Sequence, residues 1–169
     1  YESFDYDKRN ILYSASDVFT SPADSIQETF GLTPLEAMAC GVPQVVADWD
    51  GYKETVSHGE TGYRVPTYWS RCDEDISAYP DALTEEFSLD RFYSHFLLGQ
   101  SVAIDLNYFE YYLQKLLDNP VLQKNMSAKS IEVFKKNYTL KQTVRSYEAV
   151  WDELIRIKSI TKCESTFNL

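Results

Sequence analysis

The first third of the chain alternates between short apolar runs and amphipathic segments. Residues 44–47 (QVVA) form a compact apolar run of the kind that is buried on both faces of a parallel sheet. Residues 17–21 and 63–65 are rich in β-branched and aromatic side chains, so they also predict strands. Strands that alternate with helices predict an α/β layered fold with a parallel sheet. The predicted helices are 8–16, 34–40 and 52–57, and Gly41 and Pro43 are predicted to end the second of them.

Helical periodicity dominates the last third of the chain. Residues 105–118 predict a helix with Asp105 as its N-cap, and Asn119-Pro120 ends this helix and begins another that runs to about residue 136. Residues 140–158 predict a third helix. The first and third helices carry apolar stripes, which we expect to pack in the core rather than to bind a cofactor. The stripe residues are Leu106, Phe109, Leu113, Leu116, Leu117, Val144, Tyr147, Trp151 and Leu154.

The pattern breaks between residues 67 and 101. Acidic residues accumulate from Asp73 to Asp90 with no Lys or Arg among them, and aromatic residues are frequent. We interpret 67–101 as an ordered acidic insertion, and a solvated surface segment is favoured over a substrate lid. The whole pattern predicts one domain over residues 1–158 that contains this insertion and is incomplete on its amino-terminal side, followed by a flexible tail over 159–169.

Charge and composition limit which binding partners and which cellular location we expect for the protein. The 169 residues carry a formal net charge of −10, and nucleic-acid binding normally needs a basic face, so we expect no nucleic-acid partner. The three cysteines lie far apart, which suits reduced thiols and a cytoplasmic location. No apolar run reaches the roughly 20 residues that span a bilayer, so we expect at most a peripheral membrane contact, made through parts outside this chain. The chain begins with Tyr rather than Met, so we also expect that an upstream segment is missing.

Residues 27–43 (QETFGLTPLEAMACGVP) combine two glutamates with a predicted helix start. Thr33 at the N-cap, Pro34 at the first helical position and Glu36 at the third predict a capping box, in which Glu36 reaches back to the Thr33 amide. Glu28 makes no obvious cap. Amides at a helix N-terminus attract phosphate oxygens, while carboxylates accept hydrogen bonds from vicinal hydroxyls. A nucleotide sugar offers both groups.

The same stretch resembles a known family. "ETFGLTPLEAMACGVPQVVA" is similar to the Glu-x7-Glu motif of retaining glycosyltransferases of family 4, which have the two-Rossmann-domain GT-B architecture. Further segments resemble the family in its order: "LYSASDVFTSP", "HGETGYRVP", "LQKLLDNPVLQKNMS" and "YEAVWDEL". These segments cover most of 11–66 and 102–154. The resemblance implies the carboxyl-terminal, donor-binding half of such an enzyme, with a partial Rossmann-like parallel sheet, flanking helices and a helical C-terminal part.

The resemblance also implies a role for each matching position. Glu36 would bind the ribose hydroxyls of a nucleotide diphosphate sugar, and Glu28 would face the transferred sugar as the catalytic carboxylate. Main-chain amides would contact the sugar and the diphosphate and would stabilise the charge of the leaving group. No metal and no cofactor besides the donor substrate is implied, although "DWD" at 48–50 imitates a metal motif. The residues with those amides are Phe30, Gly31, Leu32 and Thr33.

The implied reaction is a hexosyltransferase-type transfer of the sugar to an acceptor hydroxyl with retention. The sugar, lipid or glycan acceptor would bind the missing amino-terminal domain, so the isolated chain is expected to be inactive. Three alternatives stay open: a non-catalytic nucleotide-sugar-binding fragment, a nucleotide-sugar epimerase of the same fold, and an interaction domain in which Glu36 only caps its helix.

The chain departs from the family pattern at two points. Thr29 stands where the family often has glycine, and a β-branched residue there resists positive φ. The family's first strands, which carry a basic pair that clamps the diphosphate, are absent, and Lys53 and Arg64 cannot be assigned that role by position.

Overall fold

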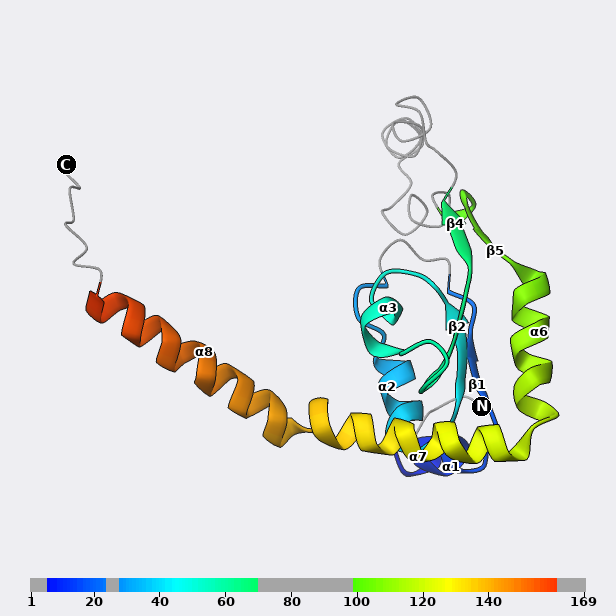
Figure 1. Ribbon diagram of the computed structural model, residues 1–169, viewed down its shortest axis with the longest axis horizontal. Helices are drawn as coiled ribbons and strands as arrows, with labels where there is room; N and C mark the ends of the chain where they lie inside the picture. The colour runs from blue at the N-terminus through cyan, green and yellow to red at the C-terminus, as the bar shows by residue number, and fades with distance from the viewer. Residues whose placement is uncertain (1–5, 24–27, 70–98, 161–169) are drawn as a thin grey trace.

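Three parallel strands form the central sheet of the computed structural model (Figure 1). The structure describes residues 6–23, 28–69 and 99–160. The strands are β1 (Phe19–Ser21), β2 (Gln44–Ala47) and β3 (Gly62–Val65), in the order β1-β2-β3. Val45 of β2 pairs with Thr20 on one side and with Tyr63 on the other. All four residues of β2 are buried, as expected for a middle strand covered on both faces, so the predicted α/β fold with a parallel sheet is confirmed.

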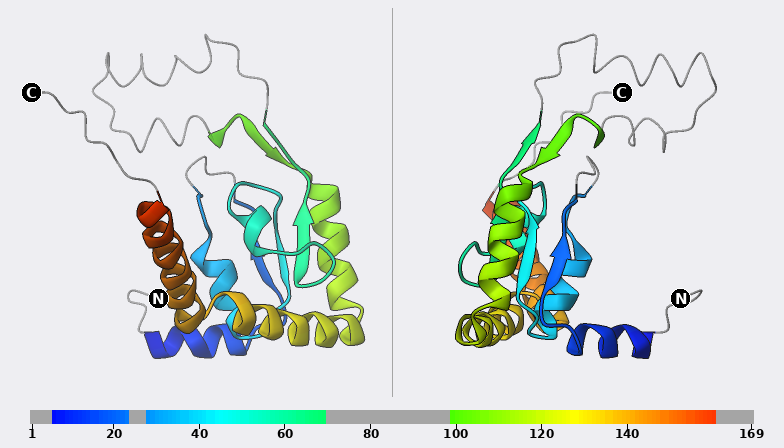
Figure 2. Two further views of the ribbon diagram at one scale, coloured as in Figure 1. Left: turned by 60° about the vertical axis from the view of Figure 1, so that its left-hand side comes forward. Right: turned by 90° about the vertical axis from the view of Figure 1, so that its right-hand side faces the viewer.

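Helices cover both faces of this sheet. The described helices are α1 (Tyr6–Ser14), α2 (Leu32–Ala39), α3 (Tyr52–Thr55), α6 (Leu106–Leu117), α7 (Pro120–Asn137) and α8 (Leu140–Ile160). Crossovers between parallel strands are almost always right-handed, so two successive crossovers in one direction place α2 and α3 on the same face. α6 lies against the opposite face, and α7 crosses beneath the sheet and contacts both α2 and α6 (Figures 1 and 2).

The core follows from this layering. On the α6 side, Val45 and Val65 pack with Leu116 of α6 and Met126 of α7. On the α3 side, a second buried cluster unites three residues: Val46, Tyr52 and Val56. Each of these side chains is less than about 3 % exposed, so the two clusters hold the helices to the two sheet faces.

The ends of three helices are set by the residues that the sequence predicts. α2 ends in a Schellman motif: the Gly41 amide donates to the Met38 carbonyl at 3.0 Å, the Val42 amide donates to the Ala37 carbonyl at 2.9 Å, and Gly41 has a φ of 71°. Asp105 caps α6 by accepting from the amides of residues 107 and 108, and Asn119 caps α7 by accepting from the amide of residue 122. These three boundary predictions are confirmed.

A two-stranded antiparallel sheet stands next to the central sheet, and sequence patterns did not predict it. β4 (Thr67–Trp69) pairs with β5 (Val102–Ile104), and the Trp69 indole N–H donates to the Ser101 hydroxyl at 2.7 Å. These strands frame the predicted acidic insertion, of which residues 70–98 lie outside the described residues. The predicted flexible tail over 159–169 begins two residues too early, because α8 continues to Ile160, and residues 161–169 lie outside the described residues.

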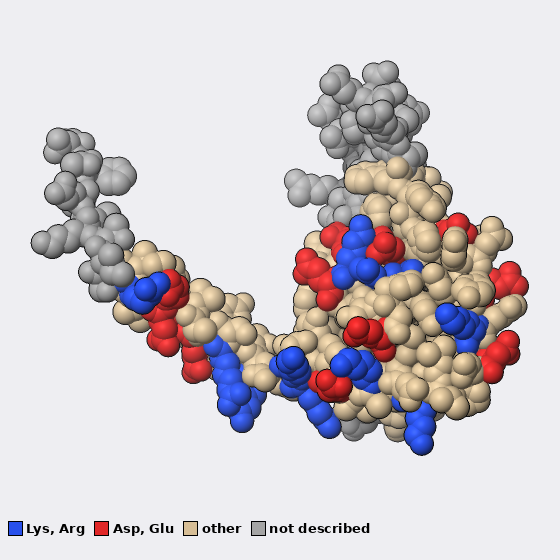
Figure 3. Space-filling view, viewed as in Figure 1, with Lys and Arg blue, Asp and Glu red and all other residues tan. Residues whose placement is uncertain are grey.

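The last helix differs from its prediction. α8 leaves the body of the molecule after α7 and extends away from it (Figure 1). Val144, Tyr147, Trp151 and Leu154 are 46–59 % exposed, so the expectation that this stripe packs in the core is wrong for this chain. The amphipathic period is present, but no element among the described residues covers the apolar face. On the side shown in Figure 3, positive and negative side chains are interspersed over both the body and α8. Within the described ranges, no helix is long and apolar enough to cross a membrane.

Candidate functional site

The loop from β1 to α2 lies at the carboxyl edge of the parallel sheet, where ligands bind in open α/β folds. α2 begins at Leu32, with Gly31 as its N-cap in the left-handed conformation (φ 77°), and no side chain caps the helix. The predicted capping box is therefore wrong: Thr33 is inside the helix, and Glu36 does not reach back to it. Pro34 falls at the third helical position, where its missing N–H costs no intrahelical bond.

Glu36 is held by two side chains of α1. Its Oε1 forms an ion pair with the Arg9 guanidinium, and its Oε2 accepts a hydrogen bond from the Tyr13 hydroxyl at 3.1 Å. Burial, together with the hydrogen bond to Glu36 and its negative charge, raises the pKa of Tyr13 to about 12. Tyr13 is therefore a neutral hydrogen-bond donor at physiological pH.

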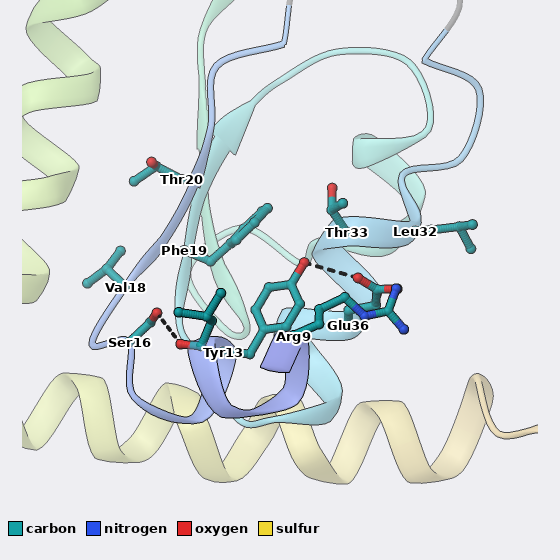
Figure 4. Close-up of a pocket in the computed structure, with 10 residues that line it drawn as sticks. Arg9, Tyr13, Ser16, Val18, Phe19, Thr20, Leu32, Thr33 and Glu36 are labelled. Atoms are coloured by element: carbon teal, nitrogen blue, oxygen red, sulfur yellow. Dashed lines mark hydrogen bonds and ion pairs between the residues drawn. The ribbon is translucent and has the colours of Figure 1, made fainter. Parts of the chain in front are cut away.

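A cavity of about 620 Å³ opens beside these residues, between α1, β1 and the start of α2 (Figure 4). Figure 4 shows Tyr13 pointing from α1 toward Glu36, with Phe19 of β1 next to it. The walls combine apolar and polar groups, and Glu36 is the acidic residue among the lining side chains. The lining residues are Arg9, Leu12, Tyr13, Ser16, Val18, Phe19, Thr20, Leu32, Thr33 and Glu36.

Glu28 meets a different element. Its Oε2 accepts a long hydrogen bond, 3.4 Å, from the hydroxyl of Tyr52 at the start of α3. The same hydroxyl lies 2.8 Å from the Ser21 Oγ at the carboxyl end of β1. Burial raises the pKa of Tyr52, and the charge of Glu28 acts in the same direction. Sequence reasoning had found no structural partner for Glu28, and Tyr52 is that partner.

Two glycines allow the loop that carries Glu28 to pack against α3. A Cβ on Gly31 would lie within 2.6 Å of Cδ1 of Tyr52, and a Cβ on Gly51 would lie 2.5 Å from the backbone nitrogen of Phe30. The Gly51 amide also donates to the Glu28 carbonyl at 3.3 Å. The position of Glu28 is thus fixed by backbone packing as well as by its side chain.

The structure places the predicted site residues in two groups. Leu32, Thr33 and Glu36 line the cavity, whereas Glu28 and the loop that follows it lie against Tyr52. Phe30 is 43 % exposed and Leu32 is 68 % exposed, so the start of α2 faces solvent. Among non-glycine residues of known placement, Asp50 is the one with positive φ, so Thr29 has an ordinary backbone conformation.

Sequence reasoning missed Arg9, Tyr13 and Tyr52, because no local pattern shows that they reach the two glutamates. Tyr13 lies 23 residues from Glu36, and Tyr52 lies 24 residues from Glu28. The alternation of strands and helices did carry one usable signal, since it predicts that β1 and the ends of its neighbouring helices meet at one edge.

Other charged groups near the sheet edge have structural partners. Arg64 donates to the Lys53 carbonyl at 3.0 Å and lies 3.5 Å from Asp48. His58 accepts a hydrogen bond from the Arg64 amide through Nδ1 at 3.0 Å. Over the portion of the chain that is described, no group of three His, Cys, Asp or Glu side chains is placed to hold a metal ion.

Comparisons with known proteins agree with this fold and this motif. The solved structure of sucrose-phosphate synthase from Thermosynechococcus elongatus superposes on 92 % of this chain with a TM-score of 0.60 at 21 % identity, and it shows the same α/β architecture. Residues 3–81 match the sequence model of the family described as glycosyl transferases group 1. That segment contains β1, α2, β2, α3 and β3, with both glutamates.

Two curated relatives extend the match. A D-inositol 3-phosphate glycosyltransferase of Gordonia bronchialis is 38 % identical over 78 residues, which are 44 % of this chain and 17 % of the relative. The lipopolysaccharide core biosynthesis mannosyltransferase LpsB of Rhizobium meliloti is 31 % identical over 146 residues, which are 85 % of this chain and 31 % of the relative. The chain therefore spans less than a third of the length of either relative.

Residues 3–81 are thus similar to the group 1 glycosyl transferases, and most of the chain is similar to a longer glycosyltransferase. The family model covers the sheet and the loop with the two glutamates, and the LpsB match extends over most of the chain.

Proposed function

We propose that this chain is the donor-binding part of a retaining glycosyltransferase that uses a nucleotide diphosphate sugar. The observation that carries the proposal is the placement of the Glu36 carboxylate in the wall of a cavity of about 620 Å³, next to a helix start without a side-chain cap. Glycosyltransferase relatives and the family match support the class of reaction.

The nucleoside end of the donor would bind in the cavity. Carboxylates accept hydrogen bonds from vicinal hydroxyls, so Glu36 would bind the ribose, while the apolar side chains of Leu12, Val18 and Phe19 offer surface for a flat base. The Arg9 guanidinium in the same wall is already paired with Glu36, so the cavity suits a neutral sugar and base better than a phosphate at this point.

The diphosphate would bind at the start of α2. The first amides of a helix point outward with a partial positive charge, and no side chain caps them here. As the C1–O bond of the donor breaks, negative charge grows on the diphosphate, and the amides of Phe30, Gly31, Leu32 and Thr33 would stabilise it. Glu28 would face the transferred sugar. The acceptor oxygen would bond to C1 on the face that the diphosphate leaves, and the acceptor proton would pass to the diphosphate.

The whole reaction needs an acceptor site as well as a donor site. The relatives are more than three times longer than the matched segments, so we propose that the acceptor binds elsewhere in a longer enzyme and that this chain alone binds donor without transfer. No cofactor besides the donor substrate is proposed. Product analysis without acceptor would separate this reaction from epimerisation, because an epimerase converts its nucleotide sugar alone.

Calorimetric titration of the 169-residue chain with UDP, GDP and ADP tests the proposal, with the matching nucleotide glucoses as second ligands. We expect at least one diphosphate to bind, and Glu36→Gln to weaken it about tenfold or more through the lost charged acceptor. Glu28→Gln should lower the affinity for the nucleotide sugar more than the affinity for the free nucleoside diphosphate. Glu148→Gln on the exposed α8 is the matched control and should change neither. Absence of binding by all six ligands would refute the proposed function.

A further inference from the structure

Both glutamates of the pair accept a phenolic O–H from a tyrosine on a separate helix, α1 for Glu36 and α3 for Glu28. Tyr13 of α1 donates to Glu36 at 3.1 Å, and Tyr52 of α3 donates to Glu28 at 3.4 Å. We propose that Tyr13 and Tyr52 are positioning residues, each of which fixes one carboxylate of the donor site: Tyr13 the ribose end and Tyr52 the sugar end. This inference rests on the proposed function.

The contacts of Glu36 leave room for a ligand. A carboxylate has about four lone-pair positions, and Arg9 and Tyr13 occupy one on each oxygen. The Glu36 side chain is 27 % exposed and lines the cavity, so its remaining lone pairs can accept two ribose hydroxyls without loss of either protein contact. A carboxylate already held in one orientation loses less side-chain entropy when the ligand binds.

The ring of Tyr52 is immobilised by packing. It is 1 % exposed, belongs to the buried cluster with Val46 and Val56, and fills the space that a side chain on Gly31 would need. Its hydroxyl therefore has a fixed position at the end of β1. When the Ser21 hydroxyl donates to Tyr52, the Tyr52 proton is directed toward Glu28. Hydrogen bonds then connect the side chains of Ser21, Tyr52 and Glu28 in that order and orient the Glu28 carboxylate.

The Tyr13–Glu36 and Tyr52–Glu28 contacts would act at opposite ends of the donor, so they can be tested separately. Loss of the Tyr13 hydroxyl should matter only for ligands that have ribose hydroxyls. Loss of the Tyr52 hydroxyl should matter only for ligands that have the transferred sugar. A structural defect that merely lowered the amount of folded protein would affect all ligands equally.

The experiment is a cycle of two variants and three ligands, with the full 169-residue chain and the base that binds best. For a uridine nucleotide the ligands are UDP, 2′,3′-dideoxyuridine diphosphate and UDP-glucose. Tyr13→Phe should lower the affinity for UDP about three- to tenfold, which is the contribution of one hydrogen bond. The affinity for the dideoxy ligand should change by no more than about twofold. Tyr52→Phe should change the affinity for UDP by no more than about twofold and lower the affinity for UDP-glucose about three- to tenfold. Tyr138→Phe, whose hydroxyl contacts the Glu54 carbonyl, is the control and should change none.

Each outcome decides between the two proposals. If no nucleotide binds to the unmodified chain, the proposed function and this inference both fail. If nucleotides bind and Glu36→Gln weakens them, but Tyr13→Phe weakens UDP and the dideoxy ligand equally or not at all, the positioning role is overturned while the donor site stands. Arg9→Met removes the other partner of Glu36 and should reproduce the Tyr13→Phe pattern. It keeps the test decisive if Tyr13→Phe folds poorly.

Discussion

The ring of Tyr52 occupies the space into which a side chain on Gly31 would project, because a Cβ there would lie within 2.6 Å of Cδ1 of the ring. Gly31 is also the N-cap of α2, with a φ of 77°. One glycine thus lets the helix that carries Glu36 start where it does and lets the tyrosine that contacts Glu28 reach its partner. The geometry of the two glutamates is coupled through this close contact.

Gly31→Ala should destabilise the protein and disrupt the site. The substitution adds a Cβ at positive φ, which costs about 1 kcal/mol, and it also forces Tyr52 or the loop to move. We expect a loss of about 2–4 kcal/mol in the free energy of unfolding, measured by urea denaturation. Gly59→Ala is the control, because Gly59 has a φ of 81° with open space around it, so it should lose only the backbone cost. Equal losses in the two variants would contradict the packing argument.

The stability of the chain should depend on Tyr13 at high pH. An unfolded tyrosine loses its proton near pH 10, whereas the folded pKa of Tyr13 is raised to about 12. Between these values the folded state keeps a proton that the unfolded state has lost, so the stability present below pH 10 decreases as the pH rises toward 12. The unfolding free energy of the unmodified chain should therefore fall more steeply over this range than that of Tyr13→Phe. Parallel curves from urea denaturation at pH 9, 10 and 11 would show that Tyr13 is not held in its buried position beside Glu36 in solution.

Leu116 and Leu117 are neighbours on α6 with opposite surroundings. Leu116 is fully buried between the sheet and α7, while Leu117 is 52 % exposed. Leu116→Ala should cost about 2–5 kcal/mol, because it removes a buried side chain and leaves a cavity, whereas Leu117→Ala should cost about 0.5 kcal/mol or less. Thermal and urea denaturation of both variants check this. Similar losses would mean that α6 is rotated from its described position.

The caps of α6 and α7 should each contribute measurable stability. Asp105 accepts two amide hydrogen bonds at 3.0 and 3.2 Å, and Asn119 accepts one at 3.0 Å. Replacement of either residue by Ala should lower the free energy of unfolding by about 0.5–2 kcal/mol. Asp152→Ala, at an exposed position inside α8, is the matched control and should stay within about 0.5 kcal/mol.

Sequence patterns predicted those parts of the fold that depend on neighbouring residues. The apolar run 44–47 is β2 with the same bounds, and the caps at Asp105 and Asn119 act through residues two or three positions away. The pairing of β4 with β5 was not predicted, since the partners are separated by the whole acidic segment. The exposure of α8 was missed for a related reason: amphipathic periodicity indicates that a face needs a partner but not where the partner lies.

In the candidate site, too, the sequence predicted features set by neighbouring residues but not contacts between distant ones. The glutamates were found from the motif, but the N-cap was placed at Thr33 and the first helical residue at Pro34, because the capping signature is a local rule. Close packing of Gly31 on Tyr52 instead sets the start at Leu32. The partners of both glutamates come from segments more than 20 residues away, so only the folded chain brings them together.

The attachment of α1 to the rest of the molecule has a consequence for measured affinities. Both protein contacts of Glu36 come from α1, and the cavity lies between that helix and the sheet. Separation of α1 from α2 would remove one wall and leave the sheet intact, because the two buried clusters contain no residue of α1. Any ligand of this cavity would then slow hydrogen exchange in α1, and its apparent affinity would report how often that helix is docked.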